Sequence, residues 1–214
     1  MKTKQELFWE GTFGKEYTNR TTRTALDWDK FYLENWGSSR IEINSAFLEN
    51  VPKEARILEV GCNTGLQLDG LQRSGFTNLW GIELQEYAVE LSKQYTTHVN
   101  IVQASGFDIP FKDNFFDLVV TNGVLIHIAP ADHASIMTEI VRCTRKYVWG
   151  WEYFAPTLTE IEYRGNIGYL WKADYSALFM QYCPGLRLVK KAIYPYVSAT
   201  NAGNAECMYL LEKC

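Results

Sequence analysis

The segment RILEVGCNTG, residues 56–65, joins a short apolar run to a turn bounded by two glycines. The run at 56–60 has the length and composition of a buried strand, and a helix is expected near residues 64–73, with Gly75 placed to end it. A strand, a glycine turn and a helix form one βα unit of a parallel sheet. Because such a sheet opens its ligand crevice at the carboxyl ends of its strands, the turn at 59–65 is predicted to bind a ligand.

The rest of the chain repeats this alternation of apolar runs and amphipathic stretches. We expect each strand to be mostly apolar, since the sheet is covered on both faces. Further strands are predicted at residues 78–83, 100–104, 116–121 and 147–153. Two last strands, at 186–193 and 206–212, are joined by a loop too short for a helix, which predicts an antiparallel hairpin. The sequence therefore predicts a three-layer, doubly wound (Rossmann-like) α/β fold with a mostly parallel seven-stranded sheet.

Residues 1–50 do not follow this pattern, because they are polar and rich in irregularly spaced aromatic side chains. We interpret them as an N-terminal helical lid of two short helices over a sheet domain at 51–214. One structural domain overall is expected, since 214 residues with 47% hydrophobic content bury one sizeable core.

Composition narrows the class of partner. The net charge is −4 and no basic stripe is present, so we expect a small-molecule substrate and no nucleic acid. The amino terminus has no apolar leader, and no run of roughly 18 apolar residues occurs, which predicts a cytoplasmic protein without membrane contact. The five cysteines, odd in number and widely spaced, are typical of reduced thiols. The histidines lack a metal-binding spacing such as HExxH, so we predict no metal. A monomer or homodimer is expected.

Glu83 ends the second predicted strand, 18 residues after Gly65. A carboxylate there can accept hydrogen bonds from both hydroxyls of a ribose, in adenosyl cofactors as in nicotinamide dinucleotides. The glycine turn separates these two classes of cofactor. A dinucleotide fingerprint has the pattern Gly-x-Gly-x-x-Gly, whereas here Asn63 takes the middle glycine position and Leu66 the last. Pyrophosphate binding is therefore disfavoured, and a cofactor with a methionine tail fits the turn better.

Over about residues 55–150 the chain resembles the class I S-adenosylmethionine-dependent methyltransferases. The resemblance rests on Glu59-x-Gly61-x-x-x-Gly65, Glu83, Ala104-Ser105-Gly106, Pro110-Phe111 and Phe115-Phe116-Asp117-Leu118-Val119-Val120. More narrowly, nearly the whole chain is similar to the pseudaminic acid biosynthesis-associated methylases. That similarity rests on Gln5-Glu6-x-Phe8-Trp9 with Phe13-Gly14-x-x-Tyr17, on Phe111-Lys112-Asp113-Asn114-Phe115-Phe116-Asp117 and on Glu162-Tyr163-Arg164-Gly165.

The class I resemblance implies that S-adenosyl-L-methionine binds at the carboxyl ends of the first four strands and leaves as S-adenosyl-L-homocysteine. It implies that the turn at 61–65 contacts the methionine moiety, Glu83 the ribose, and Ser105 the adenine, although many relatives carry Asp at that last position. From the lid, Tyr17 and Arg20 are expected at the cofactor carboxylate, with surface packing as the alternative. The predicted cofactor-binding residues are Tyr17, Arg20, Glu59, Gly61, Cys62, Asn63, Gly65, Glu83, Leu84, Ser105, Gly106, Phe107, Asn122 and Gly123.

Candidate catalytic residues follow the fourth and fifth predicted strands. His127 lies just beyond the fourth, where a general base would serve a hydroxyl or ammonium acceptor, and Glu152 and Tyr153 end the fifth. In the insertion that follows, Tyr163 and Arg164 are candidate substrate-binding residues for a polar, sugar-like acceptor, and Arg164 would pair with a carboxylate if the acceptor is acidic. Purely structural roles for the histidine and for the insertion pair are the alternatives.

The sequence thus predicts an S-adenosylmethionine-dependent methyltransferase, EC 2.1.1.-, that acts on an oxygen or nitrogen atom of a small molecule. The narrower resemblance suggests a sugar or amino-sugar-derived metabolite. Two other functions stay open: an NAD-dependent oxidoreductase, which the turn disfavours, and a noncatalytic module that binds S-adenosylmethionine and regulates a partner.

Overall fold

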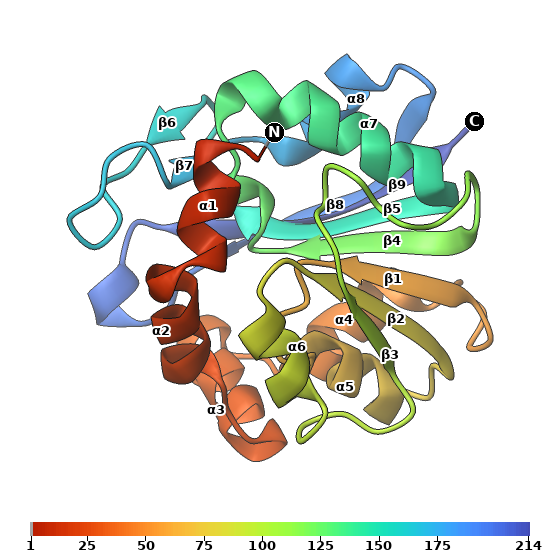
Figure 1. Cartoon of the computed structure of the whole chain (residues 1–214), viewed down its shortest axis with the longest axis horizontal. Helices are drawn as coiled ribbons and strands as arrows, with labels where there is room; N and C mark the ends of the chain where they lie inside the picture. The colour runs from red at the N-terminus through yellow and green to blue at the C-terminus, as the bar shows by residue number, and fades with distance from the viewer. Residues whose placement is uncertain (1) are drawn as a thin grey trace.

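The computed structural model of the protein describes residues 2–214, which form a seven-stranded sheet with helices on both faces (Figure 1). The strands of this sheet are β1 (Arg56–Val60), β2 (Asn78–Glu83), β3 (Asn100–Gln103), β4 (Phe116–Asn122), β5 (Thr144–Tyr153), β8 (Leu186–Pro195) and β9 (Ala205–Lys213). They lie in the order β3-β2-β1-β4-β5-β9-β8. The pairs from β3 to β5 are parallel, and β9 is antiparallel to β5 and to β8. The predicted mostly parallel sheet with its C-terminal antiparallel hairpin is confirmed.

Helices of the described chain cover the sheet in two layers. They are α1 (Lys4–Glu10), α2 (Thr12–Thr21), α3 (Ala25–Trp36), α4 (Arg40–Leu48), α5 (Leu66–Arg73), α6 (Glu86–Ser92), α7 (His133–Cys143) and α8 (Tyr175–Tyr182), with short 3-10 turns η1 (Leu125–His127), η2 (Pro130–Asp132) and η3 (Ala199–Asn201). On one face, α7 and α8 bury side chains such as Ile140 and Phe179 in a core cluster. On the other face, α3, α4 and α5 bury Trp28, Phe47 and Leu71 in a second cluster. The insertion after β5 forms a separate two-stranded pair, β6 (Thr159–Glu160) and β7 (Trp171–Lys172).

The amino-terminal region differs from the prediction of two short helices, because four helices form there. α1 and α2 begin at the caps Thr3 and Gly11 and lie over the carboxyl edge of the parallel strands (Figure 1). α3 and α4 instead belong to a helical layer, since their apolar side chains pack into the second core cluster. The irregular aromatic spacing hides this, because aromatic residues serve both the lid and the layer.

The expectation that every strand is mostly apolar holds in the middle of the sheet and is wrong at its edge. β1 is buried over its last four residues. β3 is an edge strand of four residues, and Asn100, Val102 and Gln103 are exposed. A strand that pairs on one side only, and that helices cover only in part, has no need of an apolar sequence.

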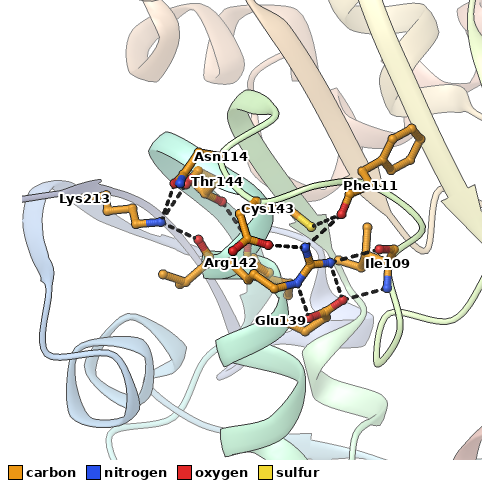
Figure 2. A network of polar contacts seen from close by, with 11 residues as sticks. Ile109, Phe111, Asn114, Glu139, Arg142, Cys143, Thr144 and Lys213 are labelled. Atoms are coloured by element: carbon orange, nitrogen blue, oxygen red, sulfur yellow. Dashed lines mark hydrogen bonds and ion pairs between the residues drawn. The ribbon is translucent and has the colours of Figure 1, made fainter.

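A polar network around Arg142 of α7 fixes the loop that follows β3 (Figure 2). The guanidinium donates hydrogen bonds to the carbonyl oxygens of Ile109, at 3.0 Å, and Phe111, at 2.9 Å. It also contacts the carboxylates of Glu139, at 2.7 Å, and Asp113, at 2.7 Å. These bonds replace the backbone partners that an irregular loop lacks, so they hold the loop between β3 and β4 in place.

Glu152, one of the predicted catalytic residues, has a structural position on β5. Its side chain is 0% exposed, and its two oxygens accept the backbone N–H groups of Val124, at 3.3 Å, and Ile126, at 3.4 Å. Burial raises the pKa of Glu152 to about 7, against the opposing effect of hydrogen bonds that include those of Thr121 and Leu125. The side chain therefore holds the loop after β4 from inside the core.

We expect Gly150→Ala to lower the free energy of unfolding by about 1–3 kcal/mol. An added methyl group would overlap the ring of Tyr209, which is 0% exposed and has no room to move. Urea denaturation followed by circular dichroism measures the change. Gly185→Ala is the matched control, since nothing lies within 4 Å of its added methyl group. Equal stability of the two variants would contradict the packing described here.

We expect the stability of Glu152→Gln, relative to the wild type, to rise with pH. The pKa of Glu152 is raised from 4.5 to about 7, so the wild type has the full stabilising contribution of this group below pH 4.5 and loses it as the pH rises through 7. The glutamine does not titrate, so the difference in unfolding free energy should change by about 3 kcal/mol in its favour between pH 4.5 and 8. Urea denaturation at a series of pH values measures this, with the exposed Glu54→Gln as control. A constant difference would exclude the proposed titration.

Candidate functional site

A cavity of about 390 Å³ lies between the carboxyl edge of the parallel strands and the amino-terminal helices. Residues at the ends of β1, β2, β3 and β4 line it, and β5 and β9 extend it. From β3 to β9 this lining crosses five strand spacings. Neighbouring strands lie about 4.8 Å apart, so the site is roughly 24 Å long. This length suits an extended ligand whose two ends differ in chemistry.

The glycine turn after β1 is shaped by close packing. Gly61 has a φ of +70°, and a side chain there would come within 2.6 Å of Val124 Cγ2. Its N–H group donates to the carbonyl oxygen of Ile82, at 2.8 Å, which ties the turn to β2. Asn63 also has a positive φ, +49°, a conformation that asparagine tolerates better than most residues. The turn thus lines the cavity with Gly61, Cys62 and Asn63 and needs no glycine in its middle position.

Glu83 stands at the last position of β2, as predicted, and lines the cavity. Its Oε2 accepts the N–H of Asn63 and its Oε1 that of Gln85, each at 2.9 Å. Burial raises the pKa of Glu83, and these backbone hydrogen bonds oppose the rise. Each oxygen keeps a further lone pair, so the fixed carboxylate can accept two more hydrogen bonds.

Glu59 and Arg40 are two buried ionisable residues at the floor of the cavity. Glu59 is 2% exposed, lines the cavity and has no hydrogen-bond partner for Oε2 among the described residues. Burial raises the pKa of Glu59 well above its usual range, and the charge of Arg40 opposes this. Arg40 is itself fully buried, donates to Gln67 Oε1 at 3.2 Å and to Tyr32 OH at 3.0 Å, and lies 4.6 Å from the ring centroid of Trp151. The free oxygen of Glu59 is thus available to a ligand.

Beyond β3, the predicted Ser105 meets a side chain from the lid. Ser105 Oγ donates a hydrogen bond to Glu6 Oε1 at 2.6 Å and accepts one from the N–H of Phe107 at 3.1 Å. Glu6 belongs to α1 and also lines the cavity. This end of the cavity therefore presents a carboxylate that the strand itself does not supply.

Arg20, in the last turn of α2, and Arg23, just after that helix, occupy different places. Arg20 is exposed, lies 3.9 Å from Glu16 and stands over the ring of Phe13. Arg23 lines the cavity, with its guanidinium 4.7 Å from the ring centroid of Phe31. Tyr17 also lines the cavity. Of the predicted lid pair, the tyrosine lies in the wall and the arginine does not.

The far end of the cavity, at β5 and β9, is aromatic and acidic. The ring centroid of Trp36 lies 5.3 Å from that of Trp151 and 4.7 Å from that of Tyr196. Glu206 is 9% exposed and accepts the Tyr196 hydroxyl at 2.7 Å. Burial raises the pKa of Glu206 to about 8. Because β9 is antiparallel, its first residues reach the same edge as the ends of the parallel strands.

His127 lines the cavity from η1, beside Trp9 at a ring distance of 4.4 Å. Its Nδ1 lies 2.8 Å from the carbonyl oxygen of Tyr169, so Nδ1 carries the proton and Nε2 is free to accept one. Burial lowers the pKa of His127 to about 4. The ring is therefore neutral at pH 7 and a weak base.

Most of the predicted site residues lie together in the cavity wall. They are Tyr17, Glu59, Gly61, Cys62, Asn63, Glu83, Leu84, Ser105, Gly106, Phe107, Asn122, Gly123 and His127. Outside the wall lie Arg20, Gly65, Glu152, Tyr153, Tyr163 and Arg164.

The residues outside the wall have other contacts or lie at the surface. Gly65 caps α5, and the ring of Tyr153 lies 4.0 Å from Lys172 Nζ. Tyr163 packs 5.2 Å from the ring of His127, and Arg164 is exposed in the turn of the insertion.

Sequence reasoning missed Glu6, Arg23, Gln85 and Glu206 as cavity residues. One of them carried a signal, because Glu6 lies within the motif of the narrower resemblance. Glu206 stands before the apolar run at 207–211, and nothing local marks it as a site residue. Within residues 2–214, no group of three His, Cys, Asp or Glu side chains is arranged to hold a metal ion. In the same range, no helix has the length and apolar character needed to cross a membrane.

Comparison with known proteins agrees with this geometry. Residues 58–148 match the family described as "Methyltransferase domain". An O-methyltransferase of Aspergillus nomiae is 31% identical over 96 residues, which are 42% of either protein. EEF1A lysine methyltransferase 2 of Danio rerio is 26% identical over 129 residues, 54% of either protein. The chain thus matches about half of the length of these relatives.

Solved structures extend the likeness in fold to the whole chain. Magnesium protoporphyrin IX methyltransferase of Synechocystis superposes with a TM-score of 0.69 at 13% identity, covering 100% of this chain and 99% of that one. An S-adenosylmethionine-dependent methyltransferase of Leishmania major gives a TM-score of 0.69 at 17% identity, covering 98% and 87%. Residues 58–148 are thus similar to a methyltransferase domain, and the whole chain has the fold of these solved methyltransferase structures.

Proposed function

We propose that the protein binds S-adenosyl-L-methionine in this cavity and transfers its methyl group to a nitrogen or oxygen atom of a small molecule. The observation that carries the proposal is the carboxylate of Glu83, which two backbone N–H groups fix at the end of β2, in the same cavity as the Gly61 turn. A carboxylate there accepts the hydroxyls of a ribose. The turn gives a methionine chain access to the backbone.

The polar groups of the wall fit the rest of this cofactor. The free Oε2 of Glu59 is a buried acceptor for the α-ammonium group. Arg23 is the cationic side chain of the wall and would pair with the α-carboxylate, in place of the predicted Arg20. When bound, S-adenosylmethionine supplies an electrophilic methyl carbon on its sulfonium, so the protein has mainly to orient the acceptor and exclude water.

The charge of the wall favours an amine as the acceptor. The described wall residues include four carboxylates and a single guanidinium: Glu6, Glu59, Glu83, Glu206 and Arg23. At the far end, Glu206 lines the cavity together with Trp36 and Trp151, and carboxylates and aromatic faces both attract ammonium groups. An acidic sugar would be repelled there. An amino sugar, which the narrower resemblance suggests, combines hydroxyl groups with the required amine.

Glu206 is then the proton acceptor of the reaction. An ammonium group gives one proton to the carboxylate of Glu206, and the freed nitrogen lone pair forms the new C–N bond while the methyl–sulfur bond breaks. With a pKa of about 8, Glu206 is ionised and able to accept the proton above that pH, whereas a pKa of about 4 leaves His127 a poor base. We therefore assign His127 to packing in the wall and Glu206 to proton transfer.

Glu83→Gln should weaken binding of S-adenosylhomocysteine at least tenfold, because the amide loses one acceptor for the ribose hydroxyls and the charge that strengthens both bonds. Isothermal titration calorimetry with S-adenosylmethionine, S-adenosylhomocysteine and NAD measures this. The exposed Glu90→Gln on α6 is the control and should bind as the wild type does. Tight binding of NAD in place of the adenosyl ligands would refute the proposed cofactor.

Glu206→Gln should lower kcat/KM for an amine acceptor at least tenfold and leave the affinity for S-adenosylhomocysteine unchanged, since the carboxylate acts at the other end of the cavity. The assay measures S-adenosylhomocysteine released with glucosamine and a panel of small primary amines, each beside the alcohol or N-acetyl compound that lacks the amine.

Glu160→Gln is the control for this assay, because Glu160 is exposed on β6. Faster turnover of the alcohols than of the amines would refute the amine acceptor and leave methyl transfer standing. Binding of the adenosyl ligands without turnover of any acceptor would favour a noncatalytic module.

A further inference from the structure

Helix α1 carries a carboxylate to the end of β3. Glu6 is 9% exposed, and its Oε1 accepts the hydroxyl of Ser105 at 2.6 Å, across 99 residues of sequence. Its Oε2 accepts the backbone N–H of Thr3 at 2.7 Å, as part of the capping box of α1. Both Glu6 and Ser105 line the cavity next to Gly106.

The hydroxyl of Ser105 is largely committed. Its single proton is donated to Glu6, and one of its two lone pairs accepts the N–H of Phe107. A carboxylate is the stronger acceptor, and each oxygen of Glu6 still has a lone pair to offer. A donor group that enters this end of the cavity therefore meets Glu6 as its best partner.

The position of this end fixes which donor would enter it. If Glu83 on β2 holds the ribose, the base attached to that ribose lies over the neighbouring strand end, β3. Adenine presents an exocyclic amino group, which is a pure donor. We propose that Glu6 of the lid accepts this amino group and so selects adenine. The inference rests on the proposed cofactor.

Glu6 is in the state that this role requires. Burial raises its pKa, but the hydrogen bonds from Ser105 and Thr3, with the charge of Lys2, outweigh burial and leave the pKa below its ordinary value. The side chain is thus ionised at neutral pH and acts only as an acceptor. The carboxylate of Glu6 therefore does not change its protonation near pH 7.

The experiment uses the wild type and Glu6→Gln, titrated calorimetrically with S-adenosylhomocysteine and with S-inosylhomocysteine, in which a carbonyl replaces the amino group. Glutamine also serves in a capping box, so α1 keeps its cap. With its amide oxygen on Thr3, the amide nitrogen faces the base and is a donor. The wild type should bind the adenosyl ligand more tightly than the inosyl ligand. In Glu6→Gln the ratio of the two affinities should fall roughly tenfold or more, or reverse.

Glu10→Gln on the same helix is the matched control, since Glu10 pairs with Lys2 and lies outside the cavity wall. Ser105→Ala gives a second measurement that leaves α1 intact, and it should keep most of the preference for adenine. An unchanged preference in Glu6→Gln, or loss of the preference only in Ser105→Ala, would overturn the role of Glu6. A wild type that binds neither ligand would instead overturn the proposed cofactor.

Discussion

The reversal of strand order at β1 is the constraint on which the site depends. β1 pairs with β2 on one side and with β4 on the other, and the helices that follow β1 and β4, α5 and α7, pack on opposite faces of the sheet. The two connections therefore diverge and leave an opening at the carboxyl edge. The Gly61 turn lies at the middle of this opening, tied to β2 through the carbonyl oxygen of Ile82. The remaining strand ends set the length of the cavity and the chemistry along it.

Charge balance then explains why this opening suits a cationic ligand. Glu59 and Glu83 lie on neighbouring strands, and the charge of Glu83 adds to the burial that raises the pKa of Glu59. The charge of the buried Arg40 does not outweigh these effects, and Glu59 Oε2 has no hydrogen-bond partner among the described residues. Buried carboxylates are costly unless a partner neutralises them. The proposed cofactor brings a sulfonium and an ammonium against one carboxylate, and its product has lost the sulfonium charge. The wall should therefore hold the cofactor more tightly than the product.

The central sheet could be predicted because its signals are local. Which side chains reach the site depends instead on how the strands pair, which the local sequence does not show. The ranges expected for β1 and β2 match the structure, since apolar runs bounded by a turn define them. Glu206 could not be found in this way, because only the antiparallel pairing of β9 brings it to the edge where the parallel strands end. Glu152 was expected in the site from its place at a strand end. Side chains alternate along a strand, so Trp151 lines the cavity and Glu152 points to the opposite face, towards the loop after β4.

The lid is itself ordered by the site that it covers. α1 has only seven residues, and a helix of that length is not stable alone. Its contacts include Glu6 on Ser105, Gln5 on the carbonyl oxygen of Gly168 at 3.1 Å, and the ring of Phe8 stacked on that of Tyr169 at 3.9 Å. One contact joins α1 to the end of β3, and the other two join it to the insertion after β5. A ligand that bonds to Glu6 adds to the first of these contacts, so ordering of α1 and occupation of the adenine end stabilise each other by linkage. The capping box and the proposed adenine contact would use the same side chain, Glu6, so α1 would then be part of the binding site.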